Sequence, residues 1–197
     1  MSKPPIIMWF RRDLRTSDHA ALTAACDSGA PVIPLVIRDA SVTDLGAAPK
    51  WRWGLGVSHL AKTLEEKGSR LIMRSGDARG VLQALMKETG AKSVFWSRLY
   101  DPDAVARDTA IKADLKEQNI DARSFGGHLM FEPWTVETKT GGYYKVYTPM
   151  WRAVKDRDVD APLPAPGRIP APDPLPKSED IAHWALRADL HRRPGIV

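Results

Sequence analysis

Short strand-like segments alternate along this chain with longer stretches in which apolar side chains recur every three or four residues. The first segment, residues 6–10, is apolar throughout and lies between Pro5 and Arg11. Runs without polar alternation are typical of strands buried on both faces of a sheet. Short, largely apolar runs of this kind predict five strands, at residues 6–10, 32–37, 69–74, 92–97 and 120–125.

The stretches between these segments predict four helices. One begins near Asp18 with Ser17 as its cap, a second has Pro49 in its first turn, and the others cover residues 77–89 and 102–118. Connections of this length force consecutive strands to run parallel. We therefore predict an α/β fold with a doubly wound, five-stranded parallel sheet (Rossmann-like), in the usual strand order 3-2-1-4-5.

The alternation stops after residue 131. One short helix is predicted at residues 148–155, and seven prolines then lie between Pro162 and Pro176. Proline fixes φ and lacks an N–H, so this stretch predicts an extended, semi-rigid connector. We divide the chain into an α/β domain at residues 1–158 and a Pro-rich linker and tail at residues 159–197, too short for a second domain.

Composition narrows the classes of protein. The 197 residues are 43% hydrophobic, carry a net charge of +5 and include one cysteine, Cys26. No secretory signal or membrane-spanning run is apparent, so we expect a cytoplasmic protein without disulfides. The mild basicity suits an anionic partner such as nucleic acid, but 24 acidic residues are mixed among the basic ones.

Charged and aromatic residues follow several of the predicted strands. In an open parallel sheet, ligands bind beyond the carboxyl ends of the strands, where the strand order reverses. Guanidinium groups stack on rings and bind carboxylates or phosphates, so such a rim suits a flat, polar heteroaromatic ligand. The candidate ligand-binding residues are Arg11, Arg12, Asp13, Arg15, Arg38, Asp39, Arg52, Arg98 and Asp101.

Simpler roles stay open for the same residues. The arginines after the first strand could pair with Asp13 and Asp18 to brace their loop, and Arg98 and Asp101 could cap the fourth helix. Trp9 and Trp96 are expected in the core. Motifs for phosphate loops, dinucleotide binding, nucleophile elbows and metal ligation are missing from the sequence, so we predict no catalytic residue and no metal site.

Two segments resemble the DNA photolyase/cryptochrome family. Residues 8–15 read MWFRRDLR, and residues 142–151 read GYYKVYTPMW. His19 stands where the family usually has asparagine. The resemblance extends over about residues 6–184, with further matches at Asp39, at Arg52-Trp53 and at Arg107-Asp108.

The resemblance implies that this is the family's N-terminal domain, which binds a light-harvesting antenna chromophore: a deazaflavin, a folate or another flavin. Arg38, Asp39, Arg52, Arg98 and Asp101 would line its pocket. Asp103-Ala104 replaces the pair typical of folate-binding members, which argues against folate. FAD would belong to a C-terminal helical domain, the expected partner, which this chain lacks. The complete protein would bind DNA and split pyrimidine dimers in light, with the target base flipped out of the duplex.

The chain alone is therefore not expected to be an active enzyme. Two alternatives remain: a cryptochrome-type light-signalling protein, or a stand-alone domain that binds a chromophore or a nucleotide. The missing phosphate-binding glycine loop argues against a generic nucleotide-binding protein.

Overall fold

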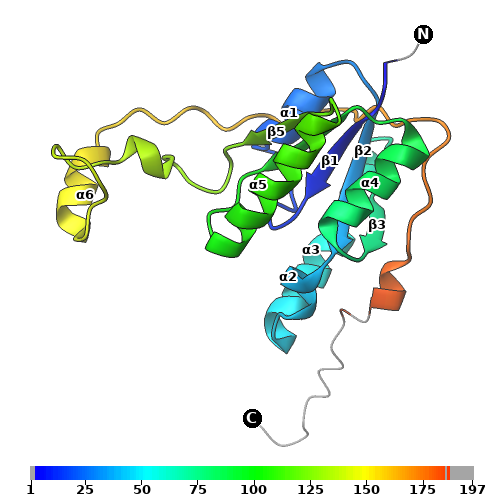
Figure 1. The fold of residues 1–197 in the computed structure, drawn as a ribbon, viewed down its shortest axis with the longest axis horizontal. Helices are drawn as coiled ribbons and strands as arrows, with labels where there is room; N and C mark the ends of the chain where they lie inside the picture. Colours follow the sequence, from blue (N-terminus) through cyan, green and yellow to red (C-terminus); the bar gives the residue numbers. More distant parts are fainter. Residues whose placement is uncertain (1–2, 185, 187–197) are drawn as a thin grey trace, which may run out of the picture.

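A computed structural model describes residues 3–184 and 186, and its centre is a parallel sheet of five strands in the order β3-β2-β1-β4-β5 (Figure 1). The predicted α/β class and strand order are both confirmed. The strands are β1 (Ile6–Phe10), β2 (Val32–Arg38), β3 (Ile72–Ser75), β4 (Ser93–Ser97) and β5 (Asp121–Phe125).

Helices cover both faces of this sheet, and side-chain alternation along β1 explains why. Ile6, Met8 and Phe10 enter one hydrophobic cluster, which includes residues of α1 (Ala20–Asp27) and α3 (Ala47–Glu66). Ile7 and Trp9 point to the other face, against residues of α4 (Ala78–Thr89) and α5 (Pro102–Glu117). Both faces of a strand must be apolar when both are covered, which accounts for the unbroken apolar run.

Most predicted helices are present with small differences at their ends. Ser17 does not cap α1, and this prediction was wrong. His19 takes the N-cap and its Nδ1 accepts a hydrogen bond from Leu22 N, because Asp18 adopts a left-handed φ of 48° and turns the chain first. A short helix, α2 (Ala40–Thr43), was not predicted, since Asp39 caps a single turn without any apolar periodicity.

The chain beyond β5 forms an arm and a connector. The arm, residues 126–158, contains the 3-10 turn η1 (Pro133–Thr135) and the helix α6 (Tyr147–Val154), and it extends away from the sheet (Figure 1). The Pro-rich connector then returns along the body of the domain. Its Ile169 is fully buried, and Val32 N donates to Pro170 O at 2.6 Å.

The connector also covers the edge strand β3. Met73 N donates to Ser178 Oγ at 2.9 Å, and Glu179 N donates to Met73 O. These bonds satisfy backbone groups that an open edge would leave free for aggregation. The described chain then passes through the 3-10 turn η2 (Ile181–Trp184). Within the described residues, no helix is long and apolar enough to span a bilayer.

Candidate functional site

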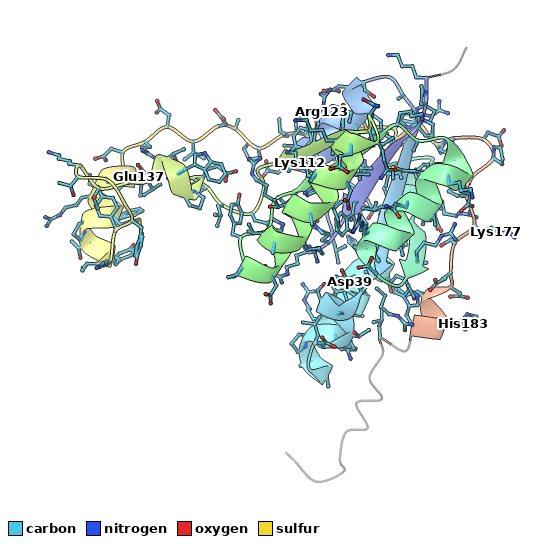
Figure 2. All side chains as sticks on the ribbon, viewed as in Figure 1. Asp39, Lys112, Arg123, Glu137, Lys177 and His183 are labelled. Atoms are coloured by element: carbon cyan, nitrogen blue, oxygen red, sulfur yellow. The ribbon has the colours of Figure 1, made fainter. Side chains whose placement is uncertain are left out.

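A crevice lies beyond the carboxyl ends of the strands, where the sheet order reverses between β1 and β4. Figure 2 shows Asp39 beside α2 at this end of the sheet, toward which the strands point. The crevice consists of an inner hollow of about 50 Å³ and an outer hollow of about 590 Å³. Five residues line both hollows: Arg12, Asp39, Ser41, Leu99 and Arg107.

The indole of Trp9 forms part of the floor of the inner hollow. Two guanidinium groups lie over it, with Arg11 Cζ at 4.7 Å and Arg107 Cζ at 5.2 Å from the ring centroid. Trp96 packs edge-on behind it at a centroid distance of 6.1 Å. Trp9 and Trp96 are both buried in the core, as predicted. A ligand in the crevice would therefore meet the guanidinium groups that cover Trp9, and planar guanidinium groups stack well on a flat π-system.

A network of ion pairs holds these guanidinium groups in place. Asp108 binds Arg11 Nη1 at 2.6 Å and Arg107 Nη2 at 2.9 Å, and Arg11 Nη2 donates to the carbonyl oxygen of Ser97. Arg107 Nη1 lies 3.4 Å from Asp39 Oδ2. The network therefore joins β1, β2, β4 and α5 around the crevice.

Arg107 and Asp108 were missing from the predicted site. A signal was available, because Ala104, Ile111 and Leu115 form the buried stripe of α5 and Asp108 falls on the same stripe. A charged residue at an inward helical position needs a partner, and here the partner is the Arg11 that was predicted.

Asp13 anchors the turn behind the floor instead of facing a ligand. Its carboxylate is 1% exposed, accepts a hydrogen bond from Arg11 N at 2.8 Å, and lies 2.8 Å from His19 Nε2. His19 Nδ1 accepts from Leu22 N, so Nε2 carries the ring proton on the side of the ring that faces Asp13. Burial raises the pKa of Asp13, but the contact with His19 and the hydrogen bond from the Arg11 amide outweigh it and hold the pKa well below its usual value.

The other predicted residues divide into three groups. Arg12 and Asp101 stay at the crevice, 3.2 Å apart, and Asp101 also caps α5 by accepting from Ala104 N. Arg15 braces two loops by donating to the carbonyl oxygens of Asp18 and Gly127. Arg98 turns toward the arm and binds Glu132 Oε1 at 2.7 Å.

Arg38 and Arg52 also point away from the crevice. Arg38 Nη1 donates to Trp184 O at 3.1 Å, on the side of the connector. Arg52 is exposed on α3 and lines neither hollow of the crevice. The structure thus brings together Arg11, Arg12, Asp39 and Asp101, and separates them from Arg15, Arg38, Arg52 and Arg98.

The outer hollow has an excess of negative charge. Two of its carboxylates are compensated, Asp39 by Arg107 and Asp101 by Arg12. Its other three, Asp44, Asp77 and Asp103, have no cation among the lining residues. Within the described chain, no three His, Cys, Asp or Glu side chains are arranged to hold a metal ion. The charge balance therefore favours a ligand that offers hydrogen-bond donors over one that brings phosphate groups.

One wall of the crevice is fastened to the end of the connector. Trp53 lines the inner hollow, donates from Nε1 to Arg11 O at 3.0 Å, and stacks on Trp184 with a centroid distance of 6.0 Å. Trp184 Nε1 donates to Glu179 Oε2 at 2.6 Å. Glu179 in turn accepts from Ser75 N and Oγ. Partial burial raises the pKa of Glu179, but these hydrogen bonds outweigh it and lower the pKa.

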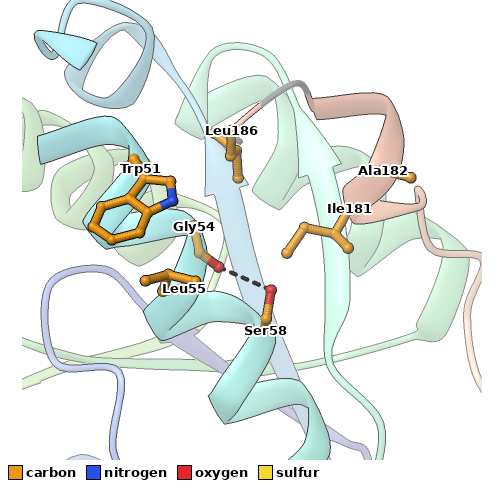
Figure 3. Close-up of a pocket in the computed structure, with 7 residues that line it drawn as sticks. All are labelled: Trp51, Gly54, Leu55, Ser58, Ile181, Ala182 and Leu186. Atoms are coloured by element: carbon orange, nitrogen blue, oxygen red, sulfur yellow. Dashed lines mark hydrogen bonds between the residues drawn. The ribbon is translucent and has the colours of Figure 1, made fainter. Parts of the chain in front are cut away.

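A second hollow lies between α3 and the connector (Figure 3). Its volume is about 320 Å³, and its lining is largely apolar, including Trp51, Leu55 and Ile181. The one hydroxyl in it, Ser58 Oγ, already donates to Gly54 O at 3.0 Å. This lining offers no charged side chain to orient a polar ligand, so we regard the crevice at the switch point as the candidate site.

The two glycines of α3 at this place allow close approach. A Cβ on Gly54 would lie 2.7 Å from Leu186 Cβ, and one on Gly56 would lie 2.9 Å from Leu14 Cδ1. Both glycines therefore serve helix packing, which agrees with their exclusion as a dinucleotide fingerprint.

Comparison with known proteins gives a consistent assignment. The DNA photolyase family model matches residues 6–168. A deoxyribodipyrimidine photo-lyase of Agrobacterium fabrum is 46% identical over 183 residues, which cover 92% of this chain and 38% of that protein. Cryptochrome-2 of Arabidopsis thaliana is 32% identical over 168 residues, with 83% of this chain and 27% of that protein covered.

A solved structure agrees with the sequence relatives. The crystal structure of a bacterial class III photolyase from Agrobacterium tumefaciens superposes with a TM-score of 0.91 at 45% identity, covering 94% of this chain and 39% of that one. The chain thus spans less than half the length of these relatives.

Proposed function

Because this chain belongs to the DNA photolyase family, we propose that it acts as the N-terminal, chromophore-binding domain of a deoxyribodipyrimidine photolyase. The observation that carries the proposal is the crevice over Trp9. It combines an aromatic floor, two guanidinium groups and a volume of about 590 Å³ in its outer part, within the range of small-molecule sites.

Repair is favoured over light signalling by sequence similarity. The identity is 46% to the Agrobacterium fabrum photolyase and 32% to Arabidopsis cryptochrome-2, over similar stretches of the chain. The photolyase-like fold alone does not separate the two activities, since a fold can host several functions.

The crevice residues suit a chromophore whose enclosed part carries no negative charge. Three carboxylates that have no cation among the residues lining the outer hollow would repel a phosphate or a glutamate tail, whereas ring N–H and hydroxyl groups would find acceptors there. Among a deazaflavin, a folate and a flavin, we therefore favour a deazaflavin without phosphate groups. The role of the protein would be to hold the ring in the outer hollow, beside the Arg107 guanidinium group that covers Trp9, and to keep Asp39 at its edge. The bound group would supply light absorption.

The catalytic step is assigned to a longer polypeptide. We propose that FAD is bound by a C-terminal helical domain, which is the partner of this domain, and that DNA is bound by the complete, cytoplasmic protein. Under this proposal the present chain splits no pyrimidine dimers in light, even with added FAD.

Titration of the purified chain with each chromophore class tests the proposal. Quenching of tryptophan fluorescence would report binding next to Trp9 and Trp53. We expect saturable quenching by a deazaflavin, weakened about tenfold in Arg107→Met, because one charged contact to a ligand contributes about 1.4 kcal/mol or more.

Two further variants complete the design. Arg123→Met is the matched control, since Arg123 is exposed on β5 and pairs with Asp121. Arg52→Met tests the sequence-based placement of Arg52 in the pocket. Equal affinity in Arg107→Met and Arg123→Met, or no binding of a deazaflavin, folate or flavin by the intact chain, would refute the crevice as the site.

A further inference from the structure

The arm carries several exposed aromatic and aliphatic side chains. Met130 is 73% exposed, Tyr143 is 77% exposed, and Tyr147 is 67% exposed. Soluble domains rarely expose large apolar side chains together unless they bind something. We call the exposed apolar residues on and next to helix α6 the arm face; its members are Tyr143, Val146, Tyr147 and Trp151.

Helix α6 at the centre of the arm face is amphipathic and lacks a partner for most of its apolar side. Tyr147, Met150, Trp151 and Val154 follow the i, i+3, i+4, i+7 spacing of one stripe, and only Val154 is buried. Tyr147 and Trp151 stack on each other with a centroid distance of 6.3 Å and an angle of 7°. The side chains of the stripe thus contact one another, but most of them are exposed to solvent.

An isolated helix of this length is not stable in water. Helices shorter than about 12 residues are marginal without tertiary packing, and α6 has eight residues. No helix or strand of the described chain packs extensively against it. Covering the stripe would supply the missing packing energy, so the arm face is built for a partner.

The charges of the arm argue against DNA as that partner. Arg157 is engaged by Thr135 O and by the ring of Phe131, and Lys155 pairs with Asp156. The remaining cations of residues 133–158 are Lys139, Lys145 and Arg152, and Glu137 and Asp158 flank them in the sequence. A nucleic-acid surface needs a clear excess of positive charge, whereas a protein surface with an apolar centre does not.

The longer relatives indicate which protein covers the arm face. The arm lies inside the family match at residues 6–168, so it is shared with photolyases of which this chain spans 38% or 39%. In such a polypeptide more than half of the chain lies beyond the matched part. Figure 1 shows that the connector leaves α6 and crosses to the opposite side of the domain, where η2 lies. The later part of the polypeptide would thus begin far from the arm.

We propose that the arm face is the docking surface for an apolar face on the C-terminal part of the longer photolyase polypeptide. This rests on the proposed function as a photolyase domain. The later part would then be held at two separate places, covalently at the connector and non-covalently at the arm. Two-point attachment fixes the orientation of two domains far better than one flexible joint.

A chimera tests the proposal directly. Residues 1–184 of this chain would replace the matching part of the Agrobacterium fabrum photolyase, and hydrogen exchange would be compared between the chimera and the 197-residue chain. We expect the amides of residues 147–154 to exchange at least tenfold more slowly in the chimera, because the partner covers α6. Equal exchange in a chimera that retains FAD absorbance would overturn the proposal.

A matched pair of valines isolates the surface. Val146→Ser in the chimera should remove part of this protection, whereas Val105→Ser on α5 should not. Both valines are exposed, at 63% and 46%. Equal effects of the two substitutions on the protection of residues 147–154 would count against the arm face as the contact.

A measurement on the 197-residue chain covers the case in which the chimera does not fold. The chain should bind the apolar dye anilinonaphthalene sulfonate, and Tyr147→Ser with Trp151→Ser should lower the dye signal at least twofold, while Val105→Ser leaves it unchanged. An unchanged signal in the double variant overturns the proposal.

Two other occupants are tested with the same chain. Concentration-dependent dimerisation abolished by the double variant would assign the face to a second copy. Binding of a single-stranded oligonucleotide abolished by the double variant would assign it to DNA. Either result would overturn the docking proposal. Chromophore titration is independent of the arm, so failure of the proposed function is seen separately.

Discussion

Asp13→Asn should destabilise the domain by removing the charge that anchors the turn behind the crevice floor. The substitution keeps the side-chain volume, so no cavity forms. The amide oxygen can still accept from Arg11 N, now 2.8 Å from Asp13 Oδ1. The amide N–H₂ group, however, would face the proton on His19 Nε2, which lies 2.8 Å from Asp13 Oδ2.

Neither imidazole tautomer repairs this conflict. If the ring proton moves to His19 Nδ1, it faces Leu22 N–H, which donates to Nδ1 in the native protein. One buried donor is therefore unsatisfied in either arrangement. A buried donor left unsatisfied costs about 1–3 kcal/mol, and more where its lost partner was charged, so we expect a loss of about 3 kcal/mol.

Urea unfolding followed by tryptophan fluorescence measures this loss at pH 7. A loss of about 3 kcal/mol corresponds to a fall in Tm of about 6–12 °C for a domain of this size. Asp27→Asn, at the exposed end of α1, is the control and should change stability by less than about 0.5 kcal/mol.

The pH dependence provides a second test of the same contact. The folded-state pKa of Asp13 lies below its unfolded value of about 3.9. The unfolded state therefore binds the proton first, and the contribution of Asp13 is complete above about pH 5 and is lost as the pH falls through the folded-state pKa. The stability difference between the native chain and Asp13→Asn should shrink from pH 7 to pH 3. A loss below about 1 kcal/mol at pH 7, or a difference that stays constant with pH, would refute the reasoning.

Two other predictions concern the fastening of the connector. Trp184→Ala should cost about 3–5 kcal/mol because the side chain is 3% exposed and stacks on Trp53. Trp184→Ala should also weaken chromophore binding, and Trp184→Phe should have intermediate values of both Tm and chromophore affinity. Unaltered chromophore affinity in Trp184→Ala would show that the crevice wall keeps its structure without this contact to the connector. Gly54→Ala should destabilise more than Gly56→Ala, because the added methyl meets Cβ of Leu186 in the first case and the movable end of Leu14 in the second. Melting temperatures and rates of limited proteolysis in the connector would be compared between the two variants. Equal values for Gly54→Ala and Gly56→Ala would contradict the close-packing role of Gly54.

Local patterns in the sequence were sufficient to predict the architecture. Unbroken apolar strands such as Ile6–Phe10 require cover on both faces, and connections of helical length require parallel neighbours. The burial of Trp9 and Trp96 followed from the same pattern. The order 3-2-1-4-5 was predicted as the usual one for this class and is confirmed, and hollows are present between β1 and β4 where that order predicts a crevice. The cap of α1 was missed because a single left-handed residue, Asp18, moved the helix start from Ser17 to His19.

The direction of each charged side chain, in contrast, was decided only by tertiary structure. Arginine side chains are long, and the strand ends that carry Arg38 and Arg98 do not fix which neighbour they reach. Arg98 meets Glu132 of the arm and Arg38 meets Trp184 of the connector, both far away in sequence. Arg107 enters the crevice because α5 packs its Asp108 against Arg11. Such partners depend on how distant segments fold together, so the sequence determined where a site should lie and the tertiary structure determined which residues face it.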